Sequence, residues 1–437
     1  MIKKITIVLF ILCLTVGLIT AKNFYERYLK FKERVVTIED NIKTLEIENI
    51  KAHHQIDVLN TLPYKEMKVL FENPKIDFDL KMFHTPFRSN FYELDKKTSY
   101  LLEHGEHVII FFQSGKIVYF KLDDLISNDV KFYEIKNNIY NNLIKDNELF
   151  YGIKNVLKRG DELFLSYTKV EKISQNDKNY TDRCYKTSII KAKVDLEEMK
   201  FDNFFDLDDC IMRPSRENIN YSWGLYSQGG RMIEYKDNSI LMTMGDFGSA
   251  IVNKVSQDDN RPFGKIIQID LDTKNYKIFS KGHRNAMGLY WDKATDKLIE
   301  NENGPTGGDE INIIEKGKNY GSPIAYYGEQ KGELAKKTHS ELGFVEPIAH
   351  FSPAIAPSGI FKAHGNQELN NNNYFFMTTL RGESLYLIKF SNNFQKVEAI
   401  NFFEIGERIR DMIYIKDKNL YLLALDSTPG IGILRFN

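Results

Sequence analysis

Residues able to take part in chemistry are concentrated in short segments that read as turns or strand ends. They are residues 282–288 (GHRNAMG), 301–312 (NENGPTGGDEIN), 355–359 (IAPSG) and 408–411 (RIRD), with residues 379–382 (TLRG) upstream of the last. Arginine stays charged and grips carboxylates through a planar fork, so turns of this kind can build an anion site. A Gly-Pro turn can present carbonyl oxygens to a hard cation such as calcium. Taken singly, the same features also fit a surface ion pair or an ordinary tight turn.

Other chemistries have little support in the sequence. It contains no Ser-His-Asp signature, Walker loop or Cys-x-x-Cys motif, which argues against hydrolase, nucleotide and zinc sites. His283, within the GHRN turn, fits either hydrogen bonding to the backbone or a role in catalysis. Asp309 and Glu310 fit either a second cation site or pairing with a nearby arginine.

The elements that must position these turns are predicted to be short strands. Most are preceded by a turn rich in Asp, Asn, Gly or Lys, and they recur along the chain. The predicted strands are residues 107–112, 117–122, 163–168, 240–244, 264–271, 276–279, 384–390, 419–425 and 430–436. This pattern favours an all-β fold, with a β-propeller as the first prediction and a pair of β-sandwiches as the alternative.

The composition supports a folded chain without a nucleic-acid partner. The protein has 437 residues, 42% of them hydrophobic and 27% charged, which excludes a disordered polymer. Lys+Arg 59 and Asp+Glu 60 cancel to a net charge of −1, which argues against binding through bulk positive potential.

The N-terminus predicts export. Lys3 and Lys4 precede an uncharged apolar run over residues 5–21, the layout of a secretory signal peptide or of an uncleaved anchor. The expected location is periplasmic or otherwise extracytoplasmic, with residues 5–21 anchoring the chain to the inner membrane.

A helical stalk is predicted over residues 22–62, before the propeller at residues 63–437. Between Phe24 and Leu59, apolar residues recur at alternating spacings of four and three, with Asn49 as a polar exception. This pattern fits a coiled coil that associates with a second copy, or a single amphipathic stalk that spaces the body from the membrane.

The chain has three cysteines, one of them, Cys13, within the apolar run. Cys184 and Cys210 remain in the exported body, where they form either a disulfide or two buried thiols.

An ordered set of motifs resembles a known family. GHRNAMGLYWDKATDKL, ENGPTGGDEINIIEKGKNYGSPIAYYG, IAPSG, TLRGESLYLIKF and ERIRDM follow one another along the chain. Together they resemble the glucose/sorbosone dehydrogenases, soluble quinoproteins that use pyrroloquinoline quinone (PQQ). The resemblance is tight over residues 264–328 and 355–436, loose over residues 146–248 and absent before them. It implies a six-bladed β-propeller with the cofactor on one face.

The resemblance also implies which residues hold PQQ, a tricarboxylate that carries an ortho-quinone. The expected cofactor-binding residues are Arg284, Asn285, Arg381, Arg408 and Arg410. Arg408 and Arg410 are two positions apart, so on a strand both would point to the same face. Arg284 is also expected to act in catalysis, by stabilising negative charge that develops on a quinone oxygen.

Gly304 and Pro305 match the calcium site of the family, in which backbone carbonyls are ligands. By resemblance, the ion also touches the quinone and polarises it.

The catalytic base of the family is missing. In the family, a histidine opens a segment of the form H-x-(Gly/Ser)-x-Arg, followed by a strand that ends in Gly-(Asp/Glu). Here residues 227–231 read SQGGR and a strand ends in Gly245 and Asp246, so Ser227 occupies the catalytic position. An unperturbed serine hydroxyl cannot accept a proton near neutral pH. Glu148, or an aspartate on a neighbouring loop, could supply the base instead.

The predicted function is therefore PQQ-dependent, calcium-assisted oxidation of an aldose or related alcohol, with electrons leaving to an unidentified periplasmic acceptor. The alternative, favoured by Ser227, is a catalytically impaired propeller that binds a carbohydrate or a protein partner. A calcium-dependent propeller hydrolase is a third class, and it would turn over esters without PQQ.

Overall fold

The structure is a computed structural model. It describes residue 63 and residues 65–71, 76–85, 99–139, 148–172, 183–212, 227–248, 254–330, 332–427 and 429–436. The predicted anchor (residues 1–21) and stalk (residues 22–62) lie outside these residues. None of the described helices is both long enough and apolar enough to span a bilayer.

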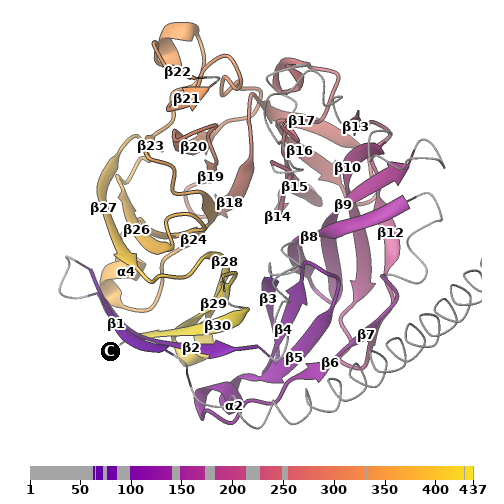
Figure 1. Ribbon diagram of the computed structural model, residues 1–437, viewed down its shortest axis with the longest axis vertical. Helices are drawn as coiled ribbons and strands as arrows, with labels where there is room; N and C mark the ends of the chain where they lie inside the picture. Colours follow the sequence, from indigo (N-terminus) through magenta and orange to yellow (C-terminus); the bar gives the residue numbers. More distant parts are fainter. Residues whose placement is uncertain are drawn as a thin grey trace, which may run out of the picture. The chain divides into compact units, whose positions relative to one another are not determined.

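Six sheets of four or five strands, counted over the described residues, surround a central axis as the blades of a propeller (Figure 1). The first three contain β3 (Ser99–His104), β4 (His107–Phe112), β5 (Ile117–Lys121) and β6 (Tyr133–Glu134); β8 (Glu148–Arg159), β9 (Glu162–Lys172), β10 (Arg183–Lys193), β12 (Asp202–Phe205) and β13 (Ile211–Met212); and β14 (Gly229–Tyr235), β15 (Ser239–Met244), β16 (Lys265–Asp270) and β17 (Tyr276–Lys281). The others contain β18 (Ala286–Asp292), β19 (Lys297–Glu302), β20 (Asp309–Ile314) and β23 (Ala349–Phe351); β24 (Pro357–Lys362), β25 (Tyr374–Thr379), β26 (Ser384–Phe390) and β27 (Val397–Glu404); and β28 (Ile409–Ile415), β29 (Leu420–Leu425), β30 (Gly430–Phe436), β2 (Asp77–His84) and β1 (Lys65–Leu70).

Among the residues that the structure describes, the remaining elements are short. They are the strand pairs β7 (Lys136–Asn137) with β11 (Glu198–Met199) and β21 (Glu329–Gln330) with β22 (Glu333–Leu334), the helices α2 (Leu122–Ile126) and α4 (Gln367–Asn371), and three 3₁₀ turns at Val255–Gln257, Ser340–Leu342 and Lys416–Lys418.

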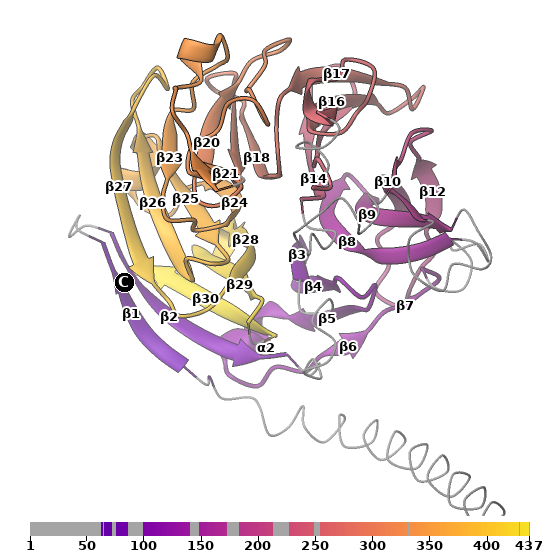
Figure 2. The same cartoon turned by 45° about the horizontal axis from the view of Figure 1, so that its top comes forward.

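The ring closes by pairing the two ends of the propeller. Strand β2 pairs antiparallel with β30 over seven residues, from Phe78↔Phe436 to His84↔Gly430. Both views show β1 and β2 beside β30 (Figures 1 and 2). This closure joins early and late strands in one blade, so the first described strands hold the last blade in place.

Burial explains why the strand sequences look as they do. Middle strands such as β15 (SILMTM) and β29 (LYLLAL) are buried at every position, because other blades cover both faces of each sheet. The outer strand β27 (VEAINFFE) alternates between partly buried and exposed residues. The core consequently lies between neighbouring sheets.

The predicted strands are confirmed, several to the residue, as for residues 107–112, 384–390 and 430–436. The six-bladed propeller is confirmed, and the pair of β-sandwiches is wrong. Cys184 and Cys210 are joined in a disulfide with their Cα atoms 5.5 Å apart, so the alternative of two free thiols is wrong. Cys13 lies outside the described residues.

Candidate active site

The turns singled out from the sequence meet at one end of the propeller. The first residue of the inner strand β18, Ala286, pairs with Glu302 at the end of β19. In the same way, Gly229 at the start of β14 pairs with Met244, and Ile409 at the start of β28 pairs with Leu425. The loops before the innermost strand of each of these blades and the loops after the strand next to it therefore lie at the same end of the propeller.

Hydrogen bonds between blades show that these strand starts lie side by side. They run from Gly229 N to Asn285 Oδ1 (3.3 Å), from Asp246 N to Arg284 O (2.9 Å), from Asn301 Nδ2 to Gly359 O (3.1 Å) and from Ser358 Oγ to Ile409 O (2.5 Å). Residues distant in the sequence are thereby fixed around the axis.

A buried ion pair spans the axis itself. Arg231 Nη1 donates to Asp411 Oδ1 (3.1 Å), and the same guanidinium donates to Met287 O and Ser358 O. Asp411 Oδ2 accepts the backbone N–H of Leu101 (3.1 Å). Burial raises the pKa of Asp411, against the opposing effect of Arg231. Arg231 thus connects four blades, and its role is structural.

Arg284 and the Gly-Pro turn line one pocket, together with Glu302, Glu310 and His339. Arg284 Nη1 donates to Asn303 O (2.8 Å), which brings the guanidinium to the residue before Gly304. Among the described residues, none donates a hydrogen bond to the carbonyl oxygens of Gly304 or Pro305. The residues predicted for the calcium site and Arg284 are therefore together, and both carbonyls are available as ligands.

Asp309 holds the Gly-Pro turn in place. Its Oδ1 accepts from Gly304 N (2.9 Å), and its Oδ2 accepts from Ile355 N and Ala356 N (2.7 Å each). Burial raises the pKa of Asp309, although these N–H groups and Arg284 oppose the shift. Its contacts assign it to loop positioning, and Glu310 pairs with His339 (3.3 Å). Both alternatives for Asp309 and Glu310, a second cation site or pairing with an arginine, stay predictions, and the positive charge of Arg284 acts to lower the pKa of Asp309.

The other arginines differ in their surroundings. Arg408 Nε and Arg410 Nη2 lie 3.6 and 3.0 Å from Asp426 Oδ2, so both point to the same side as predicted. The Arg408 side chain is 39% exposed, and that of Arg410 only 12%. Burial by itself would lower the pKa of Arg410. The negative charge of Asp426 and other neighbours outweighs the effect of burial, so the pKa of Arg410 is raised. Arg381 is exposed, on a turn whose Gly382 N donates to Ile355 O.

Ser227 is buried, 5% exposed, with a left-handed backbone (φ 71°). Its carbonyl accepts Phe247 N (2.9 Å), and a Cβ at Gly245 would overlap that carbonyl. Asp246 lies in the same turn, 2% exposed, and accepts Gly248 N. The side chain of Glu148 lies outside the described residues.

The imidazole ring of His283 contacts side chains, whereas the sequence favoured a hydrogen bond from it to the backbone. Its Nε2 lies 2.9 Å from Ser280 Oγ, and the ring stacks on Tyr320. Nδ1 lies 3.8 Å from Glu302 Oε1.

The sequence alone did not predict the residues that contact the candidate site arginines or hold the propeller axis. Asp426 and the axial role of Arg231 and Asp411 depend on contacts between blades, for which the sequence has no local signal. Asp309 was noticed only as an acid. One sequence signal could have found the buried acids. Polar residues two positions apart occur on both β19 (Glu300 and Glu302) and β20 (Glu310 and Asn312), which indicates a polar face shared by the two strands.

Comparisons with known proteins agree with this geometry. A family model described as Glucose / Sorbosone dehydrogenase matches residues 158–432. The aldose sugar dehydrogenase YliI of Escherichia coli is 30% identical over 46% of this chain, and the quinoprotein glucose dehydrogenase B of Acinetobacter calcoaceticus is 23% identical over 47%. These alignments span only 57% and 60% of the relatives' own lengths.

Solved structures share the fold. The PQQ-bound aldose sugar dehydrogenase of Streptomyces coelicolor superimposes with a TM-score of 0.56 at 20% identity, covering 82% of this chain and 97% of that one. The apo form of the soluble E. coli aldose sugar dehydrogenase gives 0.59 at 18% identity, covering 78% and 97%. The family model covers well over half of the sequence, and the chain accordingly belongs to the glucose/sorbosone dehydrogenase family.

Proposed function

We propose that this protein oxidises an aldose or related alcohol by transfer of hydride to PQQ, with calcium as an assisting ion. The observation that carries the proposal is the pocket shared by Arg284 and the unbonded carbonyls of Gly304 and Pro305, at the end of the propeller where Arg408 and Arg410 also lie. Family membership supports the same chemistry.

The chain's own polar groups fit a bound polyanion. Among the described residues, several buried polar atoms near this end have no hydrogen-bond partner: Gln228 Nε2, Asn303 Oδ1, Arg410 Nε and Asp426 Oδ1. Arg408 and the exposed Arg381 present further positive charge. Bound PQQ would supply the electron-accepting quinone, while Arg284, Arg381, Arg408, Arg410 and Asn285 would bind and orient it.

Calcium fits the Gly-Pro turn because it accepts neutral carbonyl oxygens. The carbonyls of Gly304 and Pro305 would be ligands, and Asp309 would fix the turn through its hydrogen bond to Gly304 N. Arg284 lines the same pocket, and its positive charge would stabilise negative charge that develops on the quinone.

The proton of the substrate hydroxyl needs an acceptor other than Ser227. We assign this role to the carboxylate of Asp246, since its turn is joined by hydrogen bonds both to Ser227 O and to Arg284 O. A carboxylate can hold a proton during turnover, which an unperturbed serine hydroxyl cannot.

Ser227 also favours a second candidate function, a propeller that binds a carbohydrate or a protein without oxidising it. Such a protein would bind its ligand without reducing PQQ.

Export to the periplasm, anchoring by residues 5–21 and an unidentified electron acceptor there complete the proposal. The disulfide supports export, because disulfides persist in oxidising compartments. Self-association through residues 22–62 is proposed as the role of the stalk.

The test is equilibrium binding of PQQ to the purified protein, in calcium-free buffer and with calcium added. The proposal expects one PQQ per chain and tighter binding with calcium. Absence of PQQ binding in both buffers would refute it.

A further inference from the structure

A cluster of buried acids lies beside the candidate active site, within the fourth blade. Glu300 and Glu302 are two positions apart on β19, so their side chains share one face. On β20, Asn312 pairs directly with Glu300, and Glu310 with Glu302. The two strands thus present three carboxylates and an amide on the same face.

Glu310 lies 3.3 Å from His339, but the charges of Glu300 and Glu302 are costly to bury without a further positive charge. Glu300, Glu302 and Glu310 are all at most 5% exposed. Like charges directly opposite each other on neighbouring strands destabilise a sheet, and burial adds to the cost of each charge. Burial and Glu302 raise the pKa of Glu300 well above its usual range, which reflects the same excess of negative charge.

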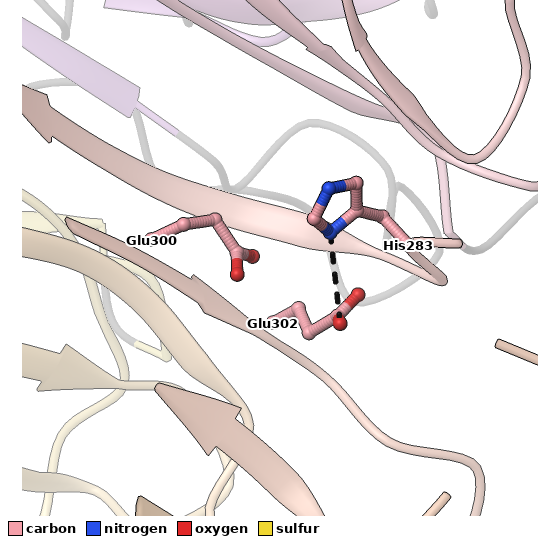
Figure 3. Close-up of side chains that lie close together, drawn as sticks. All are labelled: His283, Glu300 and Glu302. Atoms are coloured by element: carbon pink, nitrogen blue, oxygen red, sulfur yellow. Dashed lines mark ion pairs between the residues drawn. The ribbon is translucent and has the colours of Figure 1, made fainter. Parts of the chain in front are cut away.

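His283 turns an unpartnered nitrogen toward these acids. Its Nε2 is engaged by Ser280 Oγ (2.9 Å), and its ring is held against Tyr320 with centroids 4.8 Å apart. Nδ1 has no hydrogen-bond partner in the described structure, and neither has Glu300 Oε1. His283 and Glu300 are both fully buried. Figure 3 shows the side chains of His283, Glu300 and Glu302 pointing toward one another.

The separations suit a shared cation better than a hydrogen bond. His283 Nδ1 and Glu302 Oε1 are 3.8 Å apart, beyond hydrogen-bond range. One ligand atom from each of His283, Glu300 and Glu302 lies within 4.8 Å of the other two. Two ligands of one ion are at most roughly 4.3 Å apart, so small side-chain rotations complete the set.

We propose that His283 Nδ1, Glu300 and Glu302 bind a divalent first-row transition metal ion. A site with one imidazole nitrogen and carboxylate oxygens suits zinc or manganese, whereas calcium prefers oxygen ligands alone. Asn312 Nδ2 donates to Glu300 Oε2 (3.1 Å) and orients that carboxylate, as Ser280 orients the imidazole.

The site is distinct from the calcium site proposed at the Gly-Pro turn, whose ligands are backbone carbonyls. The two are close, because Glu302 belongs to the lining of the pocket that contains Gly304 and Pro305. Of the three proposed ligands, Glu302 is the one that lines this pocket, whereas His283 and Glu300 are fully buried behind it. The bound ion would tie the loop before β18, which contains His283, to β19, which contains Glu300 and Glu302.

The test uses the purified full-length protein, stripped of metal and free of both PQQ and calcium. Zinc and manganese are titrated separately by calorimetry, and bound metal is counted by mass spectrometry after gel filtration. The proposal expects one ion per chain for at least one of the two metals, together with a higher melting temperature.

Glu300→Gln should weaken binding of that metal by about tenfold or more, since it removes a ligand charge but keeps the shape. Glu315→Gln, an exposed glutamate just after β20, is the matched control and should bind as the unmodified protein does. Equal binding by both variants would overturn the proposal.

The unmodified protein provides a test that does not depend on the variants folding. Cobalt(II) in the stripped protein should give visible absorption bands that zinc or manganese displaces. If zinc, manganese and cobalt(II) all fail to bind, protons rather than a transition metal neutralise the cluster, and the proposal is overturned whether or not calcium binds at the Gly-Pro turn.

Discussion

At the scale of single residues, the arginines at the candidate site divide into two kinds. Arg231 is committed to the axis, where its hydrogen bonds to Asp411, Met287 and Ser358 use its donors. Arg408 is partly exposed and 3.6 Å from Asp426, which leaves its guanidinium able to turn toward an anion. The first kind supports the fold, and the second is suited to a ligand.

Replacing Arg408 with alanine should weaken PQQ binding by about 1–3 kcal/mol, or roughly 5- to 150-fold, as for a charge-assisted hydrogen bond. Binding is measured by titration of PQQ in the presence of calcium. Arg435→Ala, which removes an exposed arginine from β30, is the control and should leave the affinity unchanged. Equal affinities of the two variants would remove Arg408 from the cofactor site.

Replacing Asp411 with alanine should instead lower the free energy of unfolding by about 3–5 kcal/mol, because Arg231 would be left buried without its partner. Urea denaturation measures this change. Glu66→Ala, which breaks the exposed pair with Lys81, should cost less than about 1 kcal/mol. A small effect of Asp411→Ala would mean that water or another group replaces the carboxylate at the axis.

At the scale of elements, local sequence was enough to predict some of the strands but not which strands pair with one another. Residues 107–112, 384–390 and 430–436 have apolar runs bounded by turn residues, so their limits could be predicted. Strand β2 was missed, since its pairing with β30 joins residues more than 300 positions apart. Site turns were found from their residue types, whereas Asp426 and the buried face of Glu300 and Glu302 became evident only from register and contacts between blades.

Lys265, on β16, is predicted to make the free energy of unfolding depend on pH. It is fully buried, its Nζ donates to Val255 O and Phe263 O, and burial lowers its pKa from 10.5 to about 7. Between these two pH values the unfolded chain binds more protons than the folded one, so this group makes the protein more stable as the pH rises.

Lys265→Met should remove this contribution. The stability of the unmodified protein relative to the variant should therefore increase from pH 7 to about pH 10.5, measured by urea denaturation at several pH values. Lys277→Met, at an exposed position on β17, should follow the unmodified protein throughout. A pH-independent difference for Lys265→Met would show that Lys265 keeps its charge when buried.

At the scale of the whole propeller, stability depends on closing the ring. Phe78, Leu80 and Met82 of β2 are fully buried in the core shared by the last two blades. Family membership and the six-bladed fold follow from motifs spread over many blades, and the closing strand has no such motif.

A chain that begins at residue 87 should therefore fail to unfold cooperatively, because the loss of β1 and β2 exposes the edge of β30 and removes these core side chains. A chain that begins at residue 63 is the control and should unfold in a single transition. Circular dichroism during heating distinguishes them, and equal melting temperatures would contradict a closing role for β2.

The most direct test of the central claim is the absorption spectrum of the purified protein with PQQ and calcium, before and after addition of a mixture of aldoses. Oxidation of a sugar by the Asp246-assisted site predicts that the bound quinone becomes reduced, and that Asp246→Asn slows this reduction while PQQ stays bound. A quinone that remains bound and oxidised with every aldose and related alcohol tried would contradict the claim and leave a propeller that binds without oxidising.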